Sequence, residues 1–246
     1  MIIGSAIRQY EKVSSTNALA SVMLRGEQPA EGTVITAAFQ EEGRGQKGNT
    51  WESEPGKNLL MSVILYPVMV RPEEQFVISQ IVSLAVYDLV RTETPDVKIK
   101  WPNDIYVADD KIAGILIENS IMGETISNSI AGIGLNVNQK LFRSNAPNPV
   151  SLAQITGRKY DLSLITDEVI RLLDLRYAMV INGGKDELKE SYHDALYRRN
   201  EWHRYADCDG EFPGMIEGVR SDGRLLVKKE NGPVREYAFK EIDYIL

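Results

Sequence analysis

Residues 97–118 read VKIKWPNDIYVADDKIAGILIE and carry the clearest structural signal in the chain. Val97 to Trp101 alternates apolar and polar residues, which is the period of a half-buried strand. Ile105 to Val107 leads into a turn at 108–110, and Lys111 to Glu118 continues as the partner strand of a hairpin. The stretch therefore predicts consecutive antiparallel strands.

The segments on either side of this stretch predict an α+β fold. Pro72 opens a segment whose apolar residues recur at helical spacing as far as Leu89, which is typical of an amphipathic helix. The other expected elements are a short helix at 18–25, strands at 33–39 and 58–65, an extended stretch at 125–137, and helices at 163–182 and 186–199. Because strands and helices do not alternate as βαβ repeats, we expect a mixed sheet flanked by helices.

The pattern changes near residue 200. Short alternating segments at 212–218, 225–229 and 234–239 are joined by turns that contain Asp-Gly and Asn-Gly. Such short strands predict a small C-terminal β-barrel. We therefore expect a main domain at 1–198 and a small domain at 199–246.

The rare residue types exclude several kinds of site. The chain of 246 residues has a single cysteine, Cys208, and two histidines, His193 and His203. A disulfide framework, a thiolate zinc cluster and a Ser-His-Asp triad therefore have few or none of the residues they need. The net charge of −7, without a run of like charges, argues against a clamp for a nucleic-acid backbone.

No targeting or membrane signal is visible. The first ten residues contain too short an apolar stretch for a signal peptide. Leu59–Val70 is interrupted by Pro67 and falls well short of the ~20 residues that a spanning helix needs. We expect a cytoplasmic protein that does not contact a membrane.

The glycine-rich segment 43–48, GRGQKG, matches the G-x-G-x-x-G dinucleotide pattern but lacks its context. A loop at 49–56 follows it instead of a helix, and Gly48 is not followed by the Lys-Ser/Thr of a P-loop. Its glycines would still let backbone amides approach an anion, and Arg44 and Lys47 supply positive charge. A plain surface loop is the alternative interpretation.

Two further stretches carry polar residues in suggestive places. Pro102 ends a strand and presents Asn103 and Asp104 where a metal-bound phosphate could be received, although a simple turn would also explain them. Lys111 begins a strand, so its ammonium group should lie over the end of the sheet, and Gly114 leaves space for a flat ligand. A lysine on a turn is the plain alternative.

Taken in order, these segments resemble the biotin protein ligases, of the monofunctional type that lacks an N-terminal DNA-binding domain. The matching stretches are Ser15–Asn17, Gln40 with Gly43–Trp51, Lys100–Asp104, Lys111–Glu118 and Gly132–Asn136. The resemblance implies the class II synthetase-like catalytic fold that biotin and lipoate ligases share, followed by an SH3-like barrel. It also implies that the loop Gly43–Trp51 is mobile without ligand and closes over the reaction intermediate.

The resemblance further implies a two-step transfer with biotin and ATP as substrates and Mg²⁺ as the metal. The biotin carboxylate would attack the α-phosphate to give biotinyl-5′-adenylate and pyrophosphate, and a lysine of a biotin carboxyl carrier protein would then take the biotinyl group. Lys111 and Arg44 would be catalytic, and Asp104 would bind Mg²⁺. The implied biotin-binding residues are Ser15, Thr16, Asn17, Gln40, Gly43, Arg44, Gly45, Gln46, Lys111, Gly114, Leu116, Gly132 and Gly134. The implied ATP-binding residues are Arg44, Lys47, Trp51, Asn103, Lys111 and Asn136.

Two departures and two alternatives remain open from the sequence. Gln46 and Asn49 stand where many members of the family have arginine, so fewer cations face the acyl phosphate. A lipoate or octanoate ligase would share the fold and the adenylate chemistry, and a non-catalytic biotin sensor would share the pocket without turning over ATP. We expect no DNA partner, and both a monomer and a homodimer are compatible with the sequence.

Overall fold

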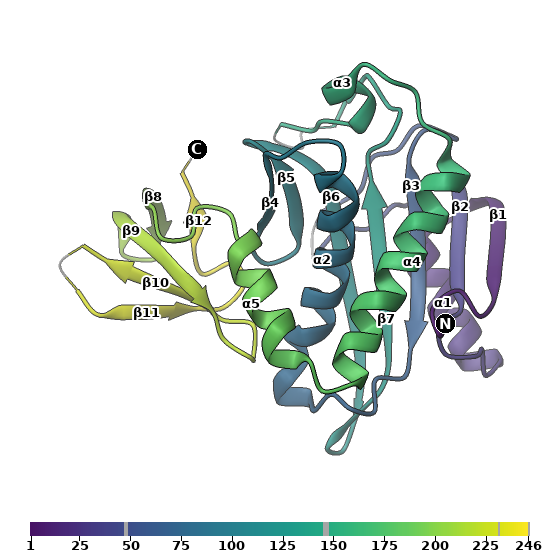
Figure 1. Cartoon of the computed structure of the whole chain (residues 1–246), viewed down its shortest axis with the longest axis horizontal. Coiled ribbons are helices and arrows are strands. Elements are labelled where there is room, and N and C mark those ends of the chain that lie inside the picture. The colour runs from purple at the N-terminus through teal and green to yellow at the C-terminus, as the bar shows by residue number, and fades with distance from the viewer. Residues whose placement is uncertain (47–48, 145–147, 231, 246) are drawn as a thin grey trace.

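The computed structural model describes residues 1–46, 49–144, 148–230 and 232–245, which form a seven-stranded sheet and a five-stranded sheet (Figure 1). The elements of the first part are β1 (Ile7–Val13), α1 (Thr16–Gly26), β2 (Val34–Gln40), β3 (Leu59–Leu65), η1 (Pro72–Glu74), α2 (Phe76–Arg91), β4 (Val97–Lys100), β5 (Asp104–Val107), β6 (Asp110–Met122), β7 (Thr125–Leu135), α3 (Leu152–Thr156), α4 (Leu162–Ile181) and α5 (Lys185–Ala195). The strand order is β1-β2-β3-β7-β6-β5-β4. The pair β1 and β2 is parallel and the other neighbouring strands are antiparallel, so the expected mixed α+β sheet is confirmed.

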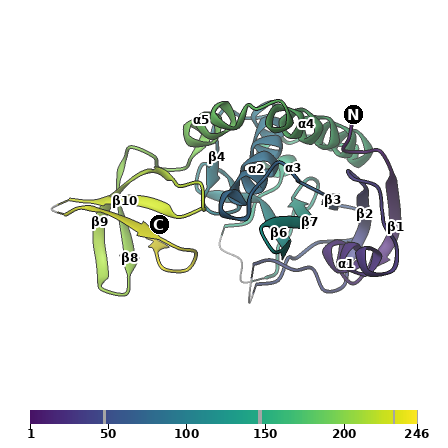
Figure 2. The same ribbon diagram turned by 90° about the horizontal axis from the view of Figure 1, so that it is seen from below.

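Helices cover the two faces of this sheet unequally. Helices α2, α4 and α5 lie together on one face, and α1 lies on the other (Figure 2). Every residue of β3 is buried, as expected for a central strand between two covered faces. Among the described residues, α1 therefore covers the second face only in part.

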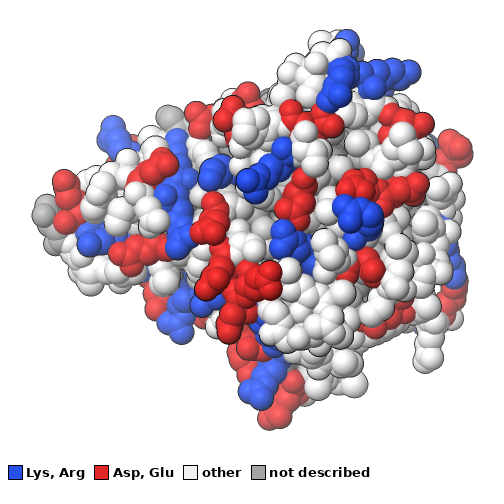
Figure 3. All heavy atoms as spheres, viewed as in Figure 1, with Lys and Arg blue, Asp and Glu red and all other residues white. Residues whose placement is uncertain are grey.

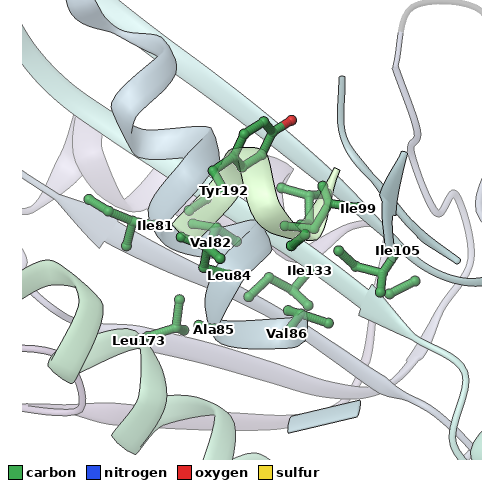
Figure 4. Close-up of a cluster of buried hydrophobic side chains, with 14 of the residues drawn as sticks. Ile81, Val82, Leu84, Ala85, Val86, Ile99, Ile105, Ile133, Leu173 and Tyr192 are labelled. Carbon is green, nitrogen blue, oxygen red and sulfur yellow. The ribbon is translucent and has the colours of Figure 1, made fainter. Parts of the chain in front are cut away.

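The main hydrophobic core lies between the sheet and the three-helix face. Ile81 and Leu84 of α2 meet Ile133 of β7 and Leu173 of α4 there (Figure 4). These side chains are at most 3% exposed, and full burial of each stabilises the fold by roughly 1.5–3 kcal/mol. A much smaller cluster, which includes Met23 and Ile64, packs α1 against the opposite face.

The C-terminal part is an antiparallel sheet of β8 (Trp202–Asp207), β9 (Gly210–Val219), β10 (Leu225–Lys229), β11 (Val234–Tyr237) and β12 (Asp243–Tyr244). Its order is β11-β10-β9-β8-β12, and in the described residues the edge strands β11 and β12 do not pair with each other. The expected small C-terminal β unit is thus present as an antiparallel sheet, but in the described residues its edge strands do not pair to close the expected barrel. Strands β8 and β12 are ones that the sequence pattern did not reveal.

The two sheets are joined by specific contacts. The indole Nε1 of Trp101 donates to the carbonyl oxygen of Gly223 at 2.8 Å, and its ring meets that of Phe239 edge-on with 6.5 Å between centroids. The backbone N–H of Val219 donates to Nε2 of His193 in α5 at 3.0 Å. The C-terminal sheet is therefore held against the end of the main sheet where β4 lies.

One local expectation needs correction, and one strand was missed. The final helix ends at Ala195 and not at residue 199, because Tyr197 donates its backbone N–H to the carbonyl of Ile99 on the edge strand β4. After Ala195 the backbone therefore leaves the helix and pairs with strand β4 of the sheet. Strand β1 was not anticipated, since its sequence IRQYEKV is largely polar and carries little of the apolar alternation that marks a strand.

The outer surface of the helices is evenly mixed in charge. Lysine, arginine, aspartate and glutamate are interspersed on this face (Figure 3), where Arg176 pairs with Asp88 and Lys185 with Glu74. Among the described residues, no helix is long and apolar enough to cross a membrane.

Asp207 at the end of β8 ties together three strands of the C-terminal sheet. Its carboxylate accepts from Lys229 at 2.8 Å and from the hydroxyl of Tyr237 at 2.7 Å. Burial alone would raise the pKa of Asp207, but these hydrogen bonds outweigh it and lower that pKa to about 2. The folded pKa lies below the unfolded value of about 3.9, so the ionised carboxylate stabilises the fold above about pH 4 and this stabilisation is lost as the pH falls towards 2.

We expect Asp207→Asn to lower the free energy of unfolding by about 2 kcal/mol at neutral pH and by much less near pH 2. Urea unfolding of both proteins at several pH values measures this difference. Asp209→Asn is the matched control, because Asp209 is exposed and its ion pair with Arg235 lies on the surface, so this change should cost less than about 0.5 kcal/mol. A difference for Asp207→Asn that does not change with pH would contradict the assignment.

Candidate active site

A cavity of about 380 Å³ opens on the α1 face of the sheet and is lined by both parts of the chain. Its lining residues are Ser15, Thr16, Asn17, Gln40, Arg44, Gly45, Gln46, Asn49, Thr50, Trp51, Lys100, Trp101, Pro102, Asn103, Asp104, Lys111, Gly114, Ile115, Leu116, Gly132, Ile133, Gly134, Phe239, Lys240, Ile242, Asp243 and Tyr244. All the site residues expected from the sequence are among them except Gly43, Lys47 and Asn136. Lys47 lies outside the described residues.

Glycines on β6 and β7 form the floor of the cavity. Gly114 is paired with Gly134, and Leu116 with Gly132, across the two strands. A Cβ atom at Gly132 would lie 2.3 Å from Oδ1 of Asn17, and one at Gly134 would lie 2.4 Å from the Trp51 ring. Only glycine therefore fits at these two positions while Asn17 and Trp51 occupy their present places.

One end of the cavity is polar but uncharged, and its amide groups are held in fixed orientations. Oε1 of Gln40 accepts from the backbone N–H of Thr16 at 2.8 Å and from its hydroxyl at 3.0 Å. The NH₂ group of Gln40 has no partner among residues 1–46, 49–144, 148–230 and 232–245, and so it is available to donate to a ligand.

In Asn17 it is the NH₂ group that bonds to the protein, whereas in Gln40 it is the amide oxygen. The NH₂ group of Asn17 donates to Oε2 of Glu118 at 2.7 Å and to the carbonyl of Leu116 at 3.3 Å. Its Oδ1 lies 2.6 Å from the hydroxyl of Ser62, which is also 2.7 Å from the Thr16 hydroxyl. Ser62 has one proton to donate, so turning it towards Thr16 frees Oδ1 of Asn17 to accept from a ligand. This end of the cavity thus offers a donor beside an acceptor.

Ser15 lies at the start of α1, and its side chain stays free of the helix. It is the N-cap residue of α1 and its carbonyl accepts from Leu19, but its side chain makes no capping bond. The hydroxyl of Ser15 is buried in the cavity wall, where a ligand can reach it.

The other end of the cavity carries charge. Nζ of Lys111 lies 2.7 Å from Oδ1 of Asp104 and 5.9 Å from the centre of the Trp51 ring. Nζ of Lys100 lies 3.1 Å from the hydroxyl of Tyr106 and over the rings of Tyr106 and Tyr244 at 4.5 and 4.9 Å. Burial lowers the pKa of Lys100. With Arg44, these side chains make a cationic end that suits a phosphate or a carboxylate.

The loop that begins at Gly43 returns on itself and places Trp51 in the cavity. The backbone N–H of Trp51 donates to the carbonyl of Gly43 at 2.8 Å, and Arg44 bridges to Thr50. The indole covers Gly114 and Gly134, so the flat group over Gly114 is a side chain of the protein itself. Its buried Nε1 has no hydrogen-bond partner within the described part of the chain. That this loop is mobile without ligand stays a prediction.

Two expected nucleotide-binding asparagines bond to the protein in this structure. Nδ2 of Asn103 donates to the carbonyl of Ile115 at 2.6 Å, although Asn103 still lines the cavity. Nδ2 of Asn136 donates to the carbonyl of Val150 at 3.1 Å, and Asn136 lies outside the lining. Gly43 is buried behind the carbonyl of Trp51.

Several lining or supporting residues were missed from the sequence. Ser62 had a detectable signal, since it is the single polar residue in the buried strand LLMSVIL. Lys100 belongs to a quoted motif but received no role. The contribution of the C-terminal part, Phe239 to Tyr244, had no local signal because it depends on how the two sheets are joined.

The carboxylates in the cavity wall fit a magnesium ion bound together with a polyphosphate. Asp104 and Asp243 both line the cavity, from opposite parts of the chain. Mg²⁺ is usually held by one or two carboxylates plus phosphate oxygens and water. Asp104 uses one oxygen for Lys111, and its second oxygen has no partner in the part of the chain that the structure describes, so it can bind a cation.

Comparisons with known proteins agree on one family. The model of the Biotin/lipoate A/B protein ligase family matches residues 10–136. The chain is 27% identical over 243 residues to the bifunctional ligase/repressor BirA of Bacillus spizizenii, covering 96% of this chain and 74% of that protein. It is 27% identical over 232 residues to the biotin–[acetyl-CoA-carboxylase] ligase of Paracoccus denitrificans, covering 90% and 93%. The structure of a biotin protein ligase from Aquifex aeolicus in complex with biotin and ATP matches with a TM-score of 0.80 and 25% identity over 97% of this chain and 98% of that chain.

We expect Gly134→Ala to expel the Trp51 indole from the floor of the cavity, because the new methyl group would lie 2.4 Å from its ring. The protein has three tryptophans, and their indole N–H signals in a nitrogen-15 NMR spectrum measure the change. The Trp51 signal should move to the position of an exposed indole while that of Trp101 stays. Gly26→Ala is the control, since nothing lies within 4 Å of its new methyl group. An unchanged Trp51 signal in Gly134→Ala would refute this packing.

Proposed function

Because the chain belongs to the biotin/lipoate A/B protein ligase family, we propose that it is an ATP-dependent biotin protein ligase. It activates biotin as biotinyl-5′-adenylate and transfers the biotinyl group to a lysine of a biotin carboxyl carrier protein. The observation that carries this proposal is the division of one cavity into an uncharged end of oriented amides and a cationic end. A ligand with a polar ring at one end and a carboxylate at the other fits such a cavity.

The uncharged end suits the ureido ring of biotin. A cyclic urea carries a carbonyl acceptor between two N–H donors. The NH₂ group of Gln40 can donate to that carbonyl, and Oδ1 of Asn17 can accept from one of the N–H groups. The dithiolane ring of lipoate and the chain of octanoate carry neither group, so binding them would leave these amides unpaired at a cost of roughly 1–3 kcal/mol each.

The cationic end suits the first chemical step. The carboxylate oxygen of biotin forms a bond to the α-phosphorus of ATP, the bond from this phosphorus to the bridging oxygen of the β-phosphate breaks, and pyrophosphate leaves. Lys111 and Arg44 reduce the repulsion between the carboxylate and the phosphate and stabilise the extra negative charge in the transition state. Bound Mg²⁺ would neutralise further phosphate charge, and Asp104 with Asp243 would hold it.

In the second step the unprotonated amine of the acceptor lysine attacks the acyl carbon. A C–N bond forms, the bond from that carbon to the phosphate oxygen breaks, AMP leaves, and the amine loses a proton. The site needs no thiol or imidazole for either step, which is consistent with a cavity lining that contains neither among the described residues. Trp51 offers an aromatic surface for the adenine, and the loop that begins at Gly43 would exclude water from the adenylate.

We expect biotin to support exchange of labelled pyrophosphate into ATP, and lipoate to support little or none. Lys111→Ala should lower the exchange rate by about 100-fold or more, as for other single charged or hydrogen-bonding groups that stabilise a transition state. Lys12→Ala is the control, because Lys12 lies on β1 in an exposed ion pair with Glu41. Absence of biotin-dependent exchange in the unmodified protein would sink the proposal, and equal exchange with lipoate would favour the alternative ligase.

We expect Ser62→Ala to weaken biotin binding by roughly 3- to 10-fold, since it removes the hydroxyl that contacts both Thr16 and Asn17. Titration calorimetry with biotin measures the dissociation constant. The Michaelis constant for ATP should change little, because Ser62 lies away from the cationic end. Unchanged biotin affinity in a folded Ser62→Ala protein would show that this hydroxyl does not support the head-group site. Ser129→Ala is the control, since Ser129 is a buried serine of β7 outside the cavity.

A further inference from the structure

Lys100 is a cation of the cavity wall that the proposed function leaves without a role. Its side chain is half-buried, and its Nζ is held by the hydroxyl of Tyr106 and by the faces of the Tyr106 and Tyr244 rings. Within the described part of the chain, no carboxylate oxygen lies within 4.0 Å of this Nζ. Asp104 pairs with Lys111 instead, at 2.7 Å. A partly desolvated ammonium group without a carboxylate partner is a binding site for an anion.

The strand order gives this anion site a definite position relative to the rest of the cavity. Ser62 of β3, Gly132 of β7 and Leu116 of β6 are paired in one row, beneath the uncharged end. Lys111 lies on β6, Asp104 on β5, and Lys100 on β4 directly opposite Asp104. The order β3-β7-β6-β5-β4 therefore leads from the head-group end, past Lys111, to Lys100. At about 4.8 Å per strand, β4 lies roughly 14 Å from β7.

We propose that Lys100, caged by Tyr106 and Tyr244, binds the pyrophosphate that leaves when biotin is adenylated. The inference rests on the proposed function. In a displacement at phosphorus, the attacking and leaving oxygens are roughly in line on opposite sides of the α-phosphorus. The carboxylate reaches Lys111 from the β7 side, so the leaving group departs towards β5 and β4, where Lys100 lies.

Tyr244 is a positioning residue in this arrangement. It comes from β12 of the C-terminal sheet, where it pairs with Tyr205 across the strands and packs edge-on against that ring at 5.3 Å. Its ring lies against the ammonium group of Lys100, with Nζ 4.9 Å from the ring centre. The C-terminal sheet thus contributes to the polyphosphate end of the site through one aromatic ring.

The test is the reverse of the first step, in which the protein converts synthetic biotinyl-5′-adenylate and pyrophosphate into ATP and biotin. Lys100→Met should raise the Michaelis constant for pyrophosphate by about 10-fold or more, while the dissociation constant of biotinyl-5′-adenylate stays within about 2-fold. Tyr244→Leu should raise the same Michaelis constant about 3-fold or more, and Tyr244→Phe, which keeps the ring, should not.

Lys98→Met is the matched control, because Lys98 lies two residues earlier on the same strand, is exposed and does not line the cavity. An unchanged constant for pyrophosphate in Lys100→Met would overturn the inference, as would a parallel loss of adenylate binding. If Lys100→Met does not fold, Tyr244→Leu and Tyr244→Phe provide the test. A higher Michaelis constant for pyrophosphate in Tyr244→Leu alone supports the inference, and equal constants in the two variants overturn it. Failure of the unmodified protein to form ATP would instead refute the proposed function.

Discussion

The register of β6 against β7 is the constraint on which the cavity depends. Successive side chains of a strand point to opposite faces, so pairing Gly114 with Gly134 and Leu116 with Gly132 sends the small residues to the α1 face. The residues between them, such as Ile133, enter the main core beneath α2. A slip of one residue would exchange the two sets, filling the cavity with branched side chains and leaving a void in the core. The same hydrogen-bond ladder therefore sets both the stability of the fold and the shape of the site.

The chemistry of the cavity follows the direction across the sheet. Neutral amides lie near α1, where they can recognise the donors and acceptors of a ligand. Cations lie towards β4, where negative charge develops during the reaction. A protein with a net charge of −7 thus concentrates Arg44, Lys100 and Lys111 at one place. The carboxylate of Asp104 keeps Lys111 in position, so its ammonium group is ordered before a substrate arrives.

The local parts of this structure were predictable from the sequence, and the parts that depend on distant contacts were not. The hairpin at 97–118 and the apolar helix after Pro72 have strong periodicity, and both are present. The end of α5 depends on pairing with the edge of β4, which no local pattern encodes. Likewise, the motif around Lys111 marked the site, but the cage around Lys100 requires Tyr244, a residue more than a hundred positions away in a different sheet. Asn136 shows the converse, since a residue of a matching motif bonds to the backbone outside the cavity.

The indole of Trp51 lies over Gly114 and Gly134 and so occupies the floor of the cavity, where a ligand would otherwise bind. A flat ligand that needs this floor binds only the fraction of molecules in which the indole has moved away. Its apparent affinity is the intrinsic affinity multiplied by that fraction, so an open population of about 1% would weaken binding about 100-fold. A ligand that stacks on the indole incurs no such penalty. If one part of a bound molecule needs the floor and another part stacks on the indole, displacement of Trp51 weakens the binding of the first part and not that of the second.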